Sequence, residues 1–98
     1  MAIMRINRPP ATSTEDYERV RERLGLGDGV PEGCQIHLVG VGDDGQVRIV
    51  EVWESREKAE AFTEQVRHVR EELGIAAGRP DIEYLDVHRI AETQHARA

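Results

Sequence analysis

The 98-residue sequence predicts an α+β fold in which two helices cover one face of a four-stranded antiparallel sheet. The clearest observation is a change of hydrophobic period between Val47 and Leu73. Residues 47–53 alternate with period 2, as in a strand, and the apolar residues that follow lie three and four positions apart, as on one face of a helix. The second observation is the succession of such patterns along the chain, β-α-β-β-α-β, which is the ferredoxin-like arrangement.

The first strand is predicted at Ala2–Arg8, where apolar and polar residues alternate. Pro9 and Pro10 end it, because neither can donate a hydrogen bond to a sheet. A helix follows. Thr12, Ser13 and Thr14 all offer N-caps, and Glu15 stands three residues after Thr12, as in a capping box.

The first helix is predicted to end at Gly25, and its buried stripe consists of Tyr17, Val20 and Leu24. The segment Gly25–Gly33 contains four glycines but no Lys-Ser/Thr pair, and it precedes a strand instead of a helix. We therefore interpret it as a plain connection and not as a phosphate-binding loop.

The second and third strands are predicted at Gln35–Val41 and Val47–Trp53, joined by a hairpin turn at Asp43–Gly45. Ser55 is expected to cap the second helix and Gly74 to end it.

The fourth strand is predicted at Ile82–Ile90, after a turn at Gly78–Pro80. The polar segment 91–98 is expected to fray. With no repeat or linker, residues 1–98 are expected to form a single domain.

Alternation along the strands divides the sheet into two unlike faces. One face is uniformly apolar, and we expect it to meet the helices; it comprises Met4, Ile6, Ile36, Leu38, Val50, Val52, Leu85 and Val87. The other face mixes apolar side chains with Arg5, Asn7, His37, Glu51, Trp53, Tyr84, Asp86 and His88. A second copy of the chain is expected to cover this mixed face, because large apolar patches mark interfaces. The resulting homodimer would enclose a cavity lined by the polar residues.

Composition excludes several classes of protein. The net charge of −6 argues against nucleic acid and anionic membrane surfaces as partners. No apolar run approaches the length of a membrane span, and residues 1–10 do not read as a signal peptide. Cys34 is the single cysteine and precludes an intrachain disulfide, so we expect a cytoplasmic protein.

The segment Glu51-Val52-Trp53-Glu54-Ser55, followed by Phe62 and set in this order of elements, resembles the dimeric α/β-barrel superfamily, in particular the antibiotic-biosynthesis-monooxygenase-like proteins. The resemblance implies paired sheets, with a pocket between sheet and helices or within the barrel. It also implies a range of activities: oxidation of polycyclic phenols without a cofactor, haem degradation, and isomerisation or cyclisation of small molecules.

The haem-degrading members have an asparagine on the first strand, a tryptophan on the second helix and a histidine ligand farther along. Asn7 matches the first position, but Phe62 aligns with the tryptophan and Glu72 with the ligand, while His68 lies one turn early. Two mismatches out of three argue against a haem enzyme.

The polyketide-oxidising members deprotonate a phenol with polar and aromatic pocket residues, and the mixed face has residues of those kinds. His37 or His88 is the expected base, since imidazole titrates near neutral pH. Trp53 and Tyr84 are expected to hold the substrate ring, and Arg5 or Asn7 to stabilise its anion. Glu51 is expected to be a buried base or to form an ion pair with Arg5 across the barrel.

Structural readings of the same residues remain open. The histidines can be hydrogen-bonded at a dimer interface, and Trp53 can be a packing anchor. We expect no metal site, since His37, His68, His88 and His95 lack tight spacing. We also expect no reactive role for Cys34, which has no evident activating neighbour.

The sequence thus predicts an enzyme without a cofactor that binds a small hydrophobic molecule, aromatic or polyketide-like, and removes a proton from it. The alternatives are a non-catalytic dimer that binds a ligand or only stabilises itself, a cyclase or isomerase, and a haem binder. A cavity of about 300 Å³ or more, lined by the residues named above, would favour ligand binding over a solid core.

Overall fold

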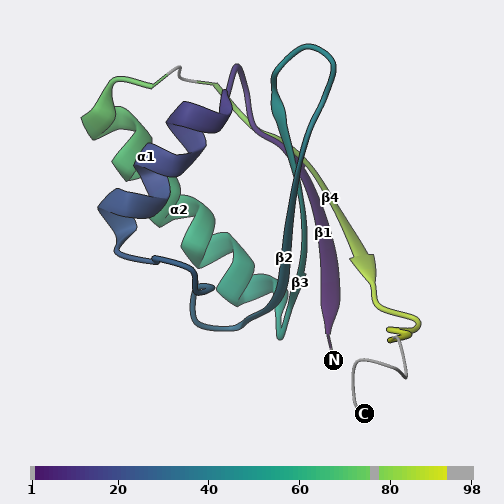
Figure 1. The fold of residues 1–98 in the computed structure, drawn as a ribbon. Coiled ribbons are helices and arrows are strands. Elements are labelled where there is room, and N and C mark those ends of the chain that lie inside the picture. The colour runs from purple at the N-terminus through teal and green to yellow at the C-terminus, as the bar shows by residue number, and fades with distance from the viewer. Residues whose placement is uncertain (1, 76–77, 93–98) are drawn as a thin grey trace.

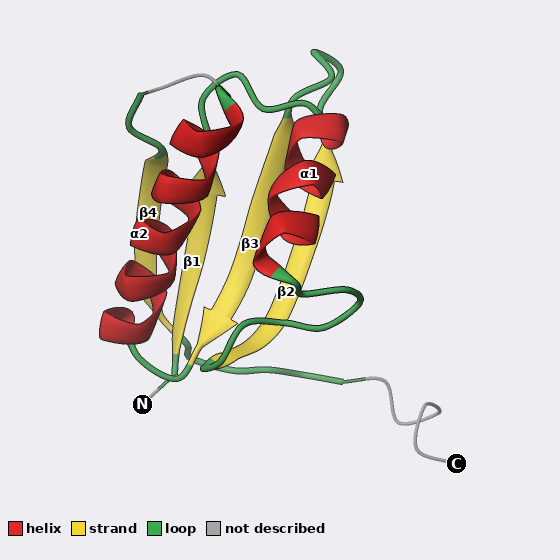
Figure 2. Cartoon of the chain, turned by 90° about the vertical axis from the view of Figure 1, so that its left-hand side faces the viewer, coloured by secondary structure: helices red, strands yellow, loops and turns green. Residues whose placement is uncertain are grey.

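A computed structural model describes residues 2–75 and 78–92. Figures 1 and 2 show two layers, a sheet and a pair of helices on one of its faces. The elements are β1 (Ile3–Arg8), α1 (Thr14–Leu24), β2 (Cys34–Val41), β3 (Val47–Trp53), α2 (Arg56–Leu73) and β4 (Asp81–Asp86). The strand order is β2-β3-β1-β4, with every neighbouring pair antiparallel. The predicted ferredoxin-like fold is confirmed.

Side-chain and glycine caps define both helices. The Ser13 hydroxyl accepts a hydrogen bond from the backbone N–H of Asp16, and Ser55 caps α2 in the same way. Gly25 and Gly74 end the helices in the left-handed conformation, with φ of 70° and 69°. The capping box from Thr12 is wrong, because the Thr12 hydroxyl donates to the Pro10 carbonyl instead.

The fourth strand is shorter than predicted. β4 ends at Asp86, which pairs with Ile3, the first residue of β1. β4 is an edge strand that pairs with β1 in the described part of the chain, so the length of β1 limits its ladder. One further hydrogen bond, from Val87 N–H to the Ala2 carbonyl, follows, and the strand assignment for residues 87–90 is wrong. The expected frayed segment lies mostly outside the described residues.

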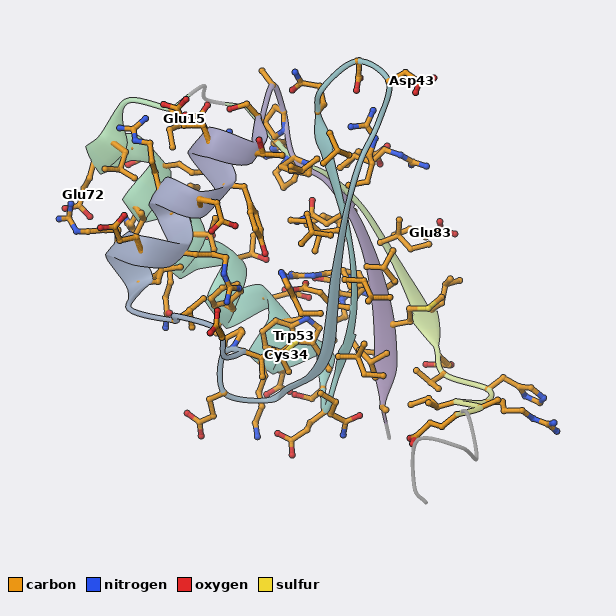
Figure 3. The ribbon with its side chains drawn as sticks, in the orientation of Figure 1. Glu15, Cys34, Asp43, Trp53, Glu72 and Glu83 are labelled. Carbon is orange, nitrogen blue, oxygen red and sulfur yellow. The ribbon has the colours of Figure 1, made fainter. Side chains whose placement is uncertain are left out.

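The predicted faces of the sheet are interchanged. Arg5 contacts the Ala59 carbonyl on α2, and Trp53 packs against Ala59 and Phe62, so the mixed face lies under the helices. Figure 3 shows Trp53 and Cys34 on the helix side of the sheet and Glu83 on the other. Figure 2 shows α1 over β2 and β3 and α2 over β1 and β4. The uniformly apolar set therefore lies on the bare face, which we call the open face.

The prediction that the apolar face meets the helices is wrong. Alternation shows that the two faces differ in composition, but it does not show which of them the helices cover. The helix-facing side is stabilised by apolar side chains around the hydrogen-bonded groups of Arg5, Glu51 and His37. Exposure on the open face of the single chain is uneven: Leu38 is 61 % exposed and Leu85 is 38 % exposed, whereas Val52 is buried.

A β-bulge at Gln35 changes which residues of β2 share a face. Cys34 pairs with Trp53 and Ile36 with Val52, so two steps on β2 match one step on β3. In a regular strand, positions 34 and 37 would point to opposite faces. The bulge places both Cys34 and His37 under the helices.

Candidate functional site

Three charged or titratable residues form a row across the helix-facing side of the sheet. Arg5 on β1 pairs in register with Glu51 on β3, and Glu51 pairs with His37 on β2. Because register partners on adjacent strands lie on the same face, the three side chains meet. The predicted Arg5–Glu51 ion pair is present, but it joins neighbouring strands of one sheet and does not cross a barrel.

The Arg5–Glu51 pair is buried, with each side chain 2 % exposed. Arg5 donates to Glu51 Oε1 from Nε at 3.1 Å and from Nη2 at 2.8 Å, and Trp53 Nε1 donates to the same oxygen at 3.1 Å. The remaining guanidinium nitrogen, Nη1, donates to the Ala59 carbonyl at 3.0 Å and to the Thr63 hydroxyl on α2. Arg5 is therefore occupied in holding Glu51 and α2.

His37 continues this network toward α1. Its Nδ1 lies 2.7 Å from Glu51 Oε2, and its Nε2 lies 2.5 Å from the Tyr17 hydroxyl. Burial by itself raises the pKa of Glu51, but the hydrogen bond from His37 and the charge of Arg5 outweigh it and hold this pKa below its ordinary value. Glu51 is thus an ionised acceptor at neutral pH, behind an imidazole ring that is 12 % exposed.

A cavity of about 510 Å³ lies between the helices and the sheet, beside this network. Its polar wall includes Arg5, Asn7, Tyr17, His37, Glu51 and Thr63. Its apolar wall includes Val20, Leu24, Ile49, Phe62, Val66 and Ile75. The buried Oδ1 of Asn7 has no hydrogen-bond partner in the structure. The arrangement offers an acid–base group to a small, mostly apolar molecule.

Three predicted site residues lie outside this cavity. Trp53 is fully buried in a cluster with Cys34 and Ala59, which is the packing-anchor role. Tyr84 packs beside that cluster, and the Arg56 guanidinium lies 4.2 Å from its ring centroid. His88 follows β4 and is exposed. Of the predicted set, the structure brings Arg5, Asn7, His37 and Glu51 to the cavity and leaves Trp53, Tyr84 and His88 away from it.

Tyr17 and Thr63 are site residues that the sequence did not single out. Tyr17 belonged to the expected apolar stripe of the first helix, and that stripe is confirmed by the burial of Val20 and the packing of Leu24. The hydroxyl of a tyrosine on a buried stripe needs a hydrogen-bond partner. This requirement is the one sequence signal for Tyr17, and it does not identify His37 as the partner.

Cys34, His37 and Glu51 form a group of potential metal ligands in the described part of the chain, with ligand atoms within 4.8 Å of one another. Burial raises the pKa of the Cys34 thiol to about 11, so the sulfur is protonated at neutral pH. A metal ion would also have to displace the His37–Glu51 hydrogen bond beside the Arg5 guanidinium. We assign the three residues to hydrogen bonding.

No helix among residues 2–75 and 78–92 has the length and apolar character that crossing a bilayer requires. No profile of a known protein family matches the chain, and no curated protein matches it in sequence.

Solved structures do match it. A protein named as a "putative antibiotic biosynthesis monooxygenase" from Deinococcus radiodurans is 14 % identical, with a TM-score of 0.56 over 96 % of this chain and 99 % of that one. A protein of the same description from Chloroflexus aurantiacus is 17 % identical, with a TM-score of 0.57 over 93 % and 98 % of the two chains.

A monooxygenase from the gene ActVA-Orf6 of Streptomyces coelicolor, solved with the ligand nanaomycin D, is 12 % identical. Its TM-score is 0.54 over 95 % of this chain and 92 % of that one. At these identities the comparisons show a shared fold, and the resemblance read from residues 51–62 is confirmed at that level.

Proposed function

We propose, from the fold that this chain shares with antibiotic-biosynthesis-monooxygenase-like proteins, that it is a small-molecule enzyme acting without a bound cofactor. Its substrate is hydrophobic and aromatic or polyketide-like, and the reaction begins with removal of an acidic proton. The observation that carries the proposal is His37, which lines a cavity of about 510 Å³ and is backed by the buried carboxylate of Glu51.

His37 is the base in this proposal. Glu51 is an ionised acceptor, so in the neutral imidazole the single ring hydrogen resides on Nδ1 and Nε2 keeps its lone pair. When Nε2 gains a proton, the carboxylate stabilises the imidazolium ion, as carboxylates do behind histidine bases. Arg5 holds the carboxylate in place and is a positioning residue.

Asn7 is the remaining candidate to stabilise the substrate anion, because it lines the cavity and Arg5 is already engaged by Glu51, Ala59 and Thr63. The resulting carbanion would react with dioxygen directly. A cyclase or isomerase would use the same base and the same donor.

The alternative of a dimer that only stabilises itself requires an interior filled by the chain's own side chains. The cavity exceeds the roughly 300 Å³ expected of a ligand site, and four of the seven predicted site residues line it. These observations support a site for a ligand.

We also propose that the chain is a homodimer in which the open faces of two copies stack. The open face carries apolar side chains from the strands beside polar ones such as Glu83, and Leu38 and Leu85 are exposed on it in the single chain, as at an interface. The cavity lies on the opposite side of the sheet, so each copy would have its own site.

Oxygen uptake with a panel of naphthols and hydroxyanthrones tests the enzymatic proposal. Replacing the base in His37→Gln is expected to lower the rate by about 10²- to 10⁴-fold, the usual contribution of a general base. His88→Gln is the matched control, since His88 is exposed and outside the cavity, and it should retain the wild-type rate. Equal rates in His37→Gln and wild type would contradict the proposal.

A further inference from the structure

We propose that Tyr17 is a catalytic residue that relays the proton: its hydroxyl receives the substrate proton while passing its own proton to His37. The inference rests on the proposed function and adds the group that contacts the substrate. Tyr17 lines the cavity, and its hydroxyl lies 2.5 Å from His37 Nε2. The other ring nitrogen, Nδ1, contacts Glu51. Nε2 is therefore the His37 nitrogen left to accept a proton, and the Tyr17 hydroxyl covers it. A substrate that approaches Nε2 from the cavity contacts the Tyr17 oxygen first.

The Glu51 carboxylate determines the direction of the hydrogen bonds that link Glu51, His37 and Tyr17. A carboxylate can only accept, so Nδ1 donates to Glu51 Oε2, and in the neutral imidazole Nε2 is then an acceptor. Tyr17 must then donate its O–H to Nε2. The lone pairs on the tyrosine oxygen remain to accept a hydrogen bond from the substrate.

Tyr17 is held in this position by its surroundings. Its ring is nearly parallel to the His37 ring, with an interplanar angle of 11° and centroids 6.0 Å apart. The Arg21 guanidinium lies 5.8 Å from the tyrosine ring centroid and donates to the carbonyls of Gly27 and Gly29, each at 2.7 Å. Val20, the buried residue of α1, anchors the same helix against α2.

The protonation state of Tyr17 suits a relay better than a base. Burial is the largest influence and raises the pKa of Tyr17, and the nearby Arg21 offsets only part of this. The residue is therefore a neutral phenol at neutral pH. Because this phenol donates to His37, it can pass its proton on while it receives one from the substrate.

The transfer balances as follows. The substrate O–H bond breaks and a new O–H bond forms at Tyr17; the original Tyr17 O–H bond breaks and an N–H bond forms at His37 Nε2. The products are a substrate anion and an imidazolium ion, and Tyr17 is neutral before and after. The substrate must enter as a neutral O–H acid, a phenol or an enol, because an ionised carboxylate has no proton to donate.

A binding experiment with 1-naphthol tests the relay, since naphtholate absorbs at longer wavelength than naphthol. Wild-type chain is expected to generate bound naphtholate. Tyr17→Phe should bind 1-naphthol within about threefold of the wild-type Kd but yield at least about tenfold less naphtholate, and ionisation should require higher pH. Tyr84→Phe is the matched control, because Tyr84 lies outside the cavity, and it should behave as wild type.

The outcomes separate the relay from the proposed function. If Tyr17→Phe forms as much naphtholate as wild type, or more, then Tyr17 merely forms a hydrogen bond to the His37 base and transfers no proton, and the relay is overturned. If wild type forms none, or His37→Gln forms as much as wild type, the proposed function fails and the relay with it.

A measurement without ligand tests the direction of the hydrogen bonds. ¹⁵N chemical shifts of the His37 ring should report a hydrogen on Nδ1 and an acceptor at Nε2, and the Nε2 shift should move in Tyr17→Phe. A hydrogen on Nε2 in the neutral wild-type ring would overturn the relay.

Discussion

Arg5 and Glu51 are the residues whose burial most constrains the molecule. Taking two ions out of water costs several kcal/mol each, and the cost is offset only when geometry and additional hydrogen bonds are good. Both carboxylate oxygens of Glu51 accept hydrogen bonds, from Arg5 and Trp53 at Oε1 and from His37 at Oε2. Removal of one partner would leave the other charge buried.

We predict that Arg5→Met lowers the free energy of unfolding by about 3–5 kcal/mol, because it leaves the Glu51 carboxylate without its cation. Urea unfolding followed by circular dichroism measures the loss. Arg8→Met is the control: the Arg8–Asp81 pair is 57 % and 76 % exposed, so its loss should cost less than about 1 kcal/mol. Equal losses in the two variants would contradict a special role for the buried pair.

Glu51 also predicts how stability depends on pH. Its pKa is lower in the folded chain than the ordinary value of 4.5, so the unfolded chain binds more protons between these two values. The stabilisation is complete above pH 4.5 and disappears as the pH falls through the folded pKa.

Urea unfolding at a series of pH values checks this dependence. Glu51→Gln should flatten the decline of stability in the acid range, whereas Glu60→Gln, which removes an exposed helix pair with Arg56, should leave it unchanged. If the free energy of unfolding falls equally steeply with decreasing pH in Glu51→Gln and wild type, the Glu51 carboxylate is not the cause of the decline.

At the scale of single elements, the bulge in β2 and the start of α2 position the site. The bulge at Gln35 sets which side of β2 carries His37, and α2 supplies the Ala59 carbonyl and the Thr63 hydroxyl that hold Arg5. The first half of α2 thus links helix stability to the geometry of the buried ion pair.

We predict that Ser55→Ala lowers the free energy of unfolding by about 1 kcal/mol, the usual cost of losing a side-chain N-cap. The Ser55 hydroxyl accepts from the Lys58 N–H at 3.2 Å, and alanine cannot. Thermal and urea unfolding measure the change. Ser55→Asp keeps an acceptor at the cap and should stay near wild type; an equal loss there would mean that the cap is not the cause.

At the scale of the whole molecule, the two faces of the sheet have different tasks. The helix-facing side holds the ion pair, His37 and the cavity, whereas the open face displays apolar side chains. Stacking two open faces would bury this surface without closing the cavity. Dimerisation is then separate from the chemistry of each site.

We predict that the chain sediments as a dimer and that Leu38→Glu sediments as a monomer. Leu38 is 61 % exposed on the open face, and a glutamate there would be buried without a partner in the dimer. Val30→Glu is the control, since Val30 is 47 % exposed in the connection after α1 and should leave the dimer intact. A monomeric wild type, by analytical ultracentrifugation, would refute the stacked arrangement.

Hydrophobic period and capping chemistry, which are local, determined most of the fold. The switch from period 2 to helical spacing after Trp53 predicted β3 and α2, and Ser55, Gly25 and Gly74 lie at the helix ends where their conformational preferences put them. An Arg5–Glu51 ion pair was one of two roles expected for the glutamate, but it was expected across a barrel and not between neighbouring strands. Local pattern overextended β4, because the length of an edge strand depends on the partner beside it.

Tertiary structure decided which face of the sheet the helices cover, and with it the composition of the site. Alternation is symmetric: it separates Arg5, His37 and Glu51 from Met4, Ile36 and Val50 without saying which set is inside. The answer depends on a hydrogen-bond network that closes only in three dimensions, when Tyr17 from α1 and Thr63 from α2 meet the sheet. A polar face can be buried when each of its groups finds a partner, and partners so far apart in the chain leave no periodic trace in the sequence.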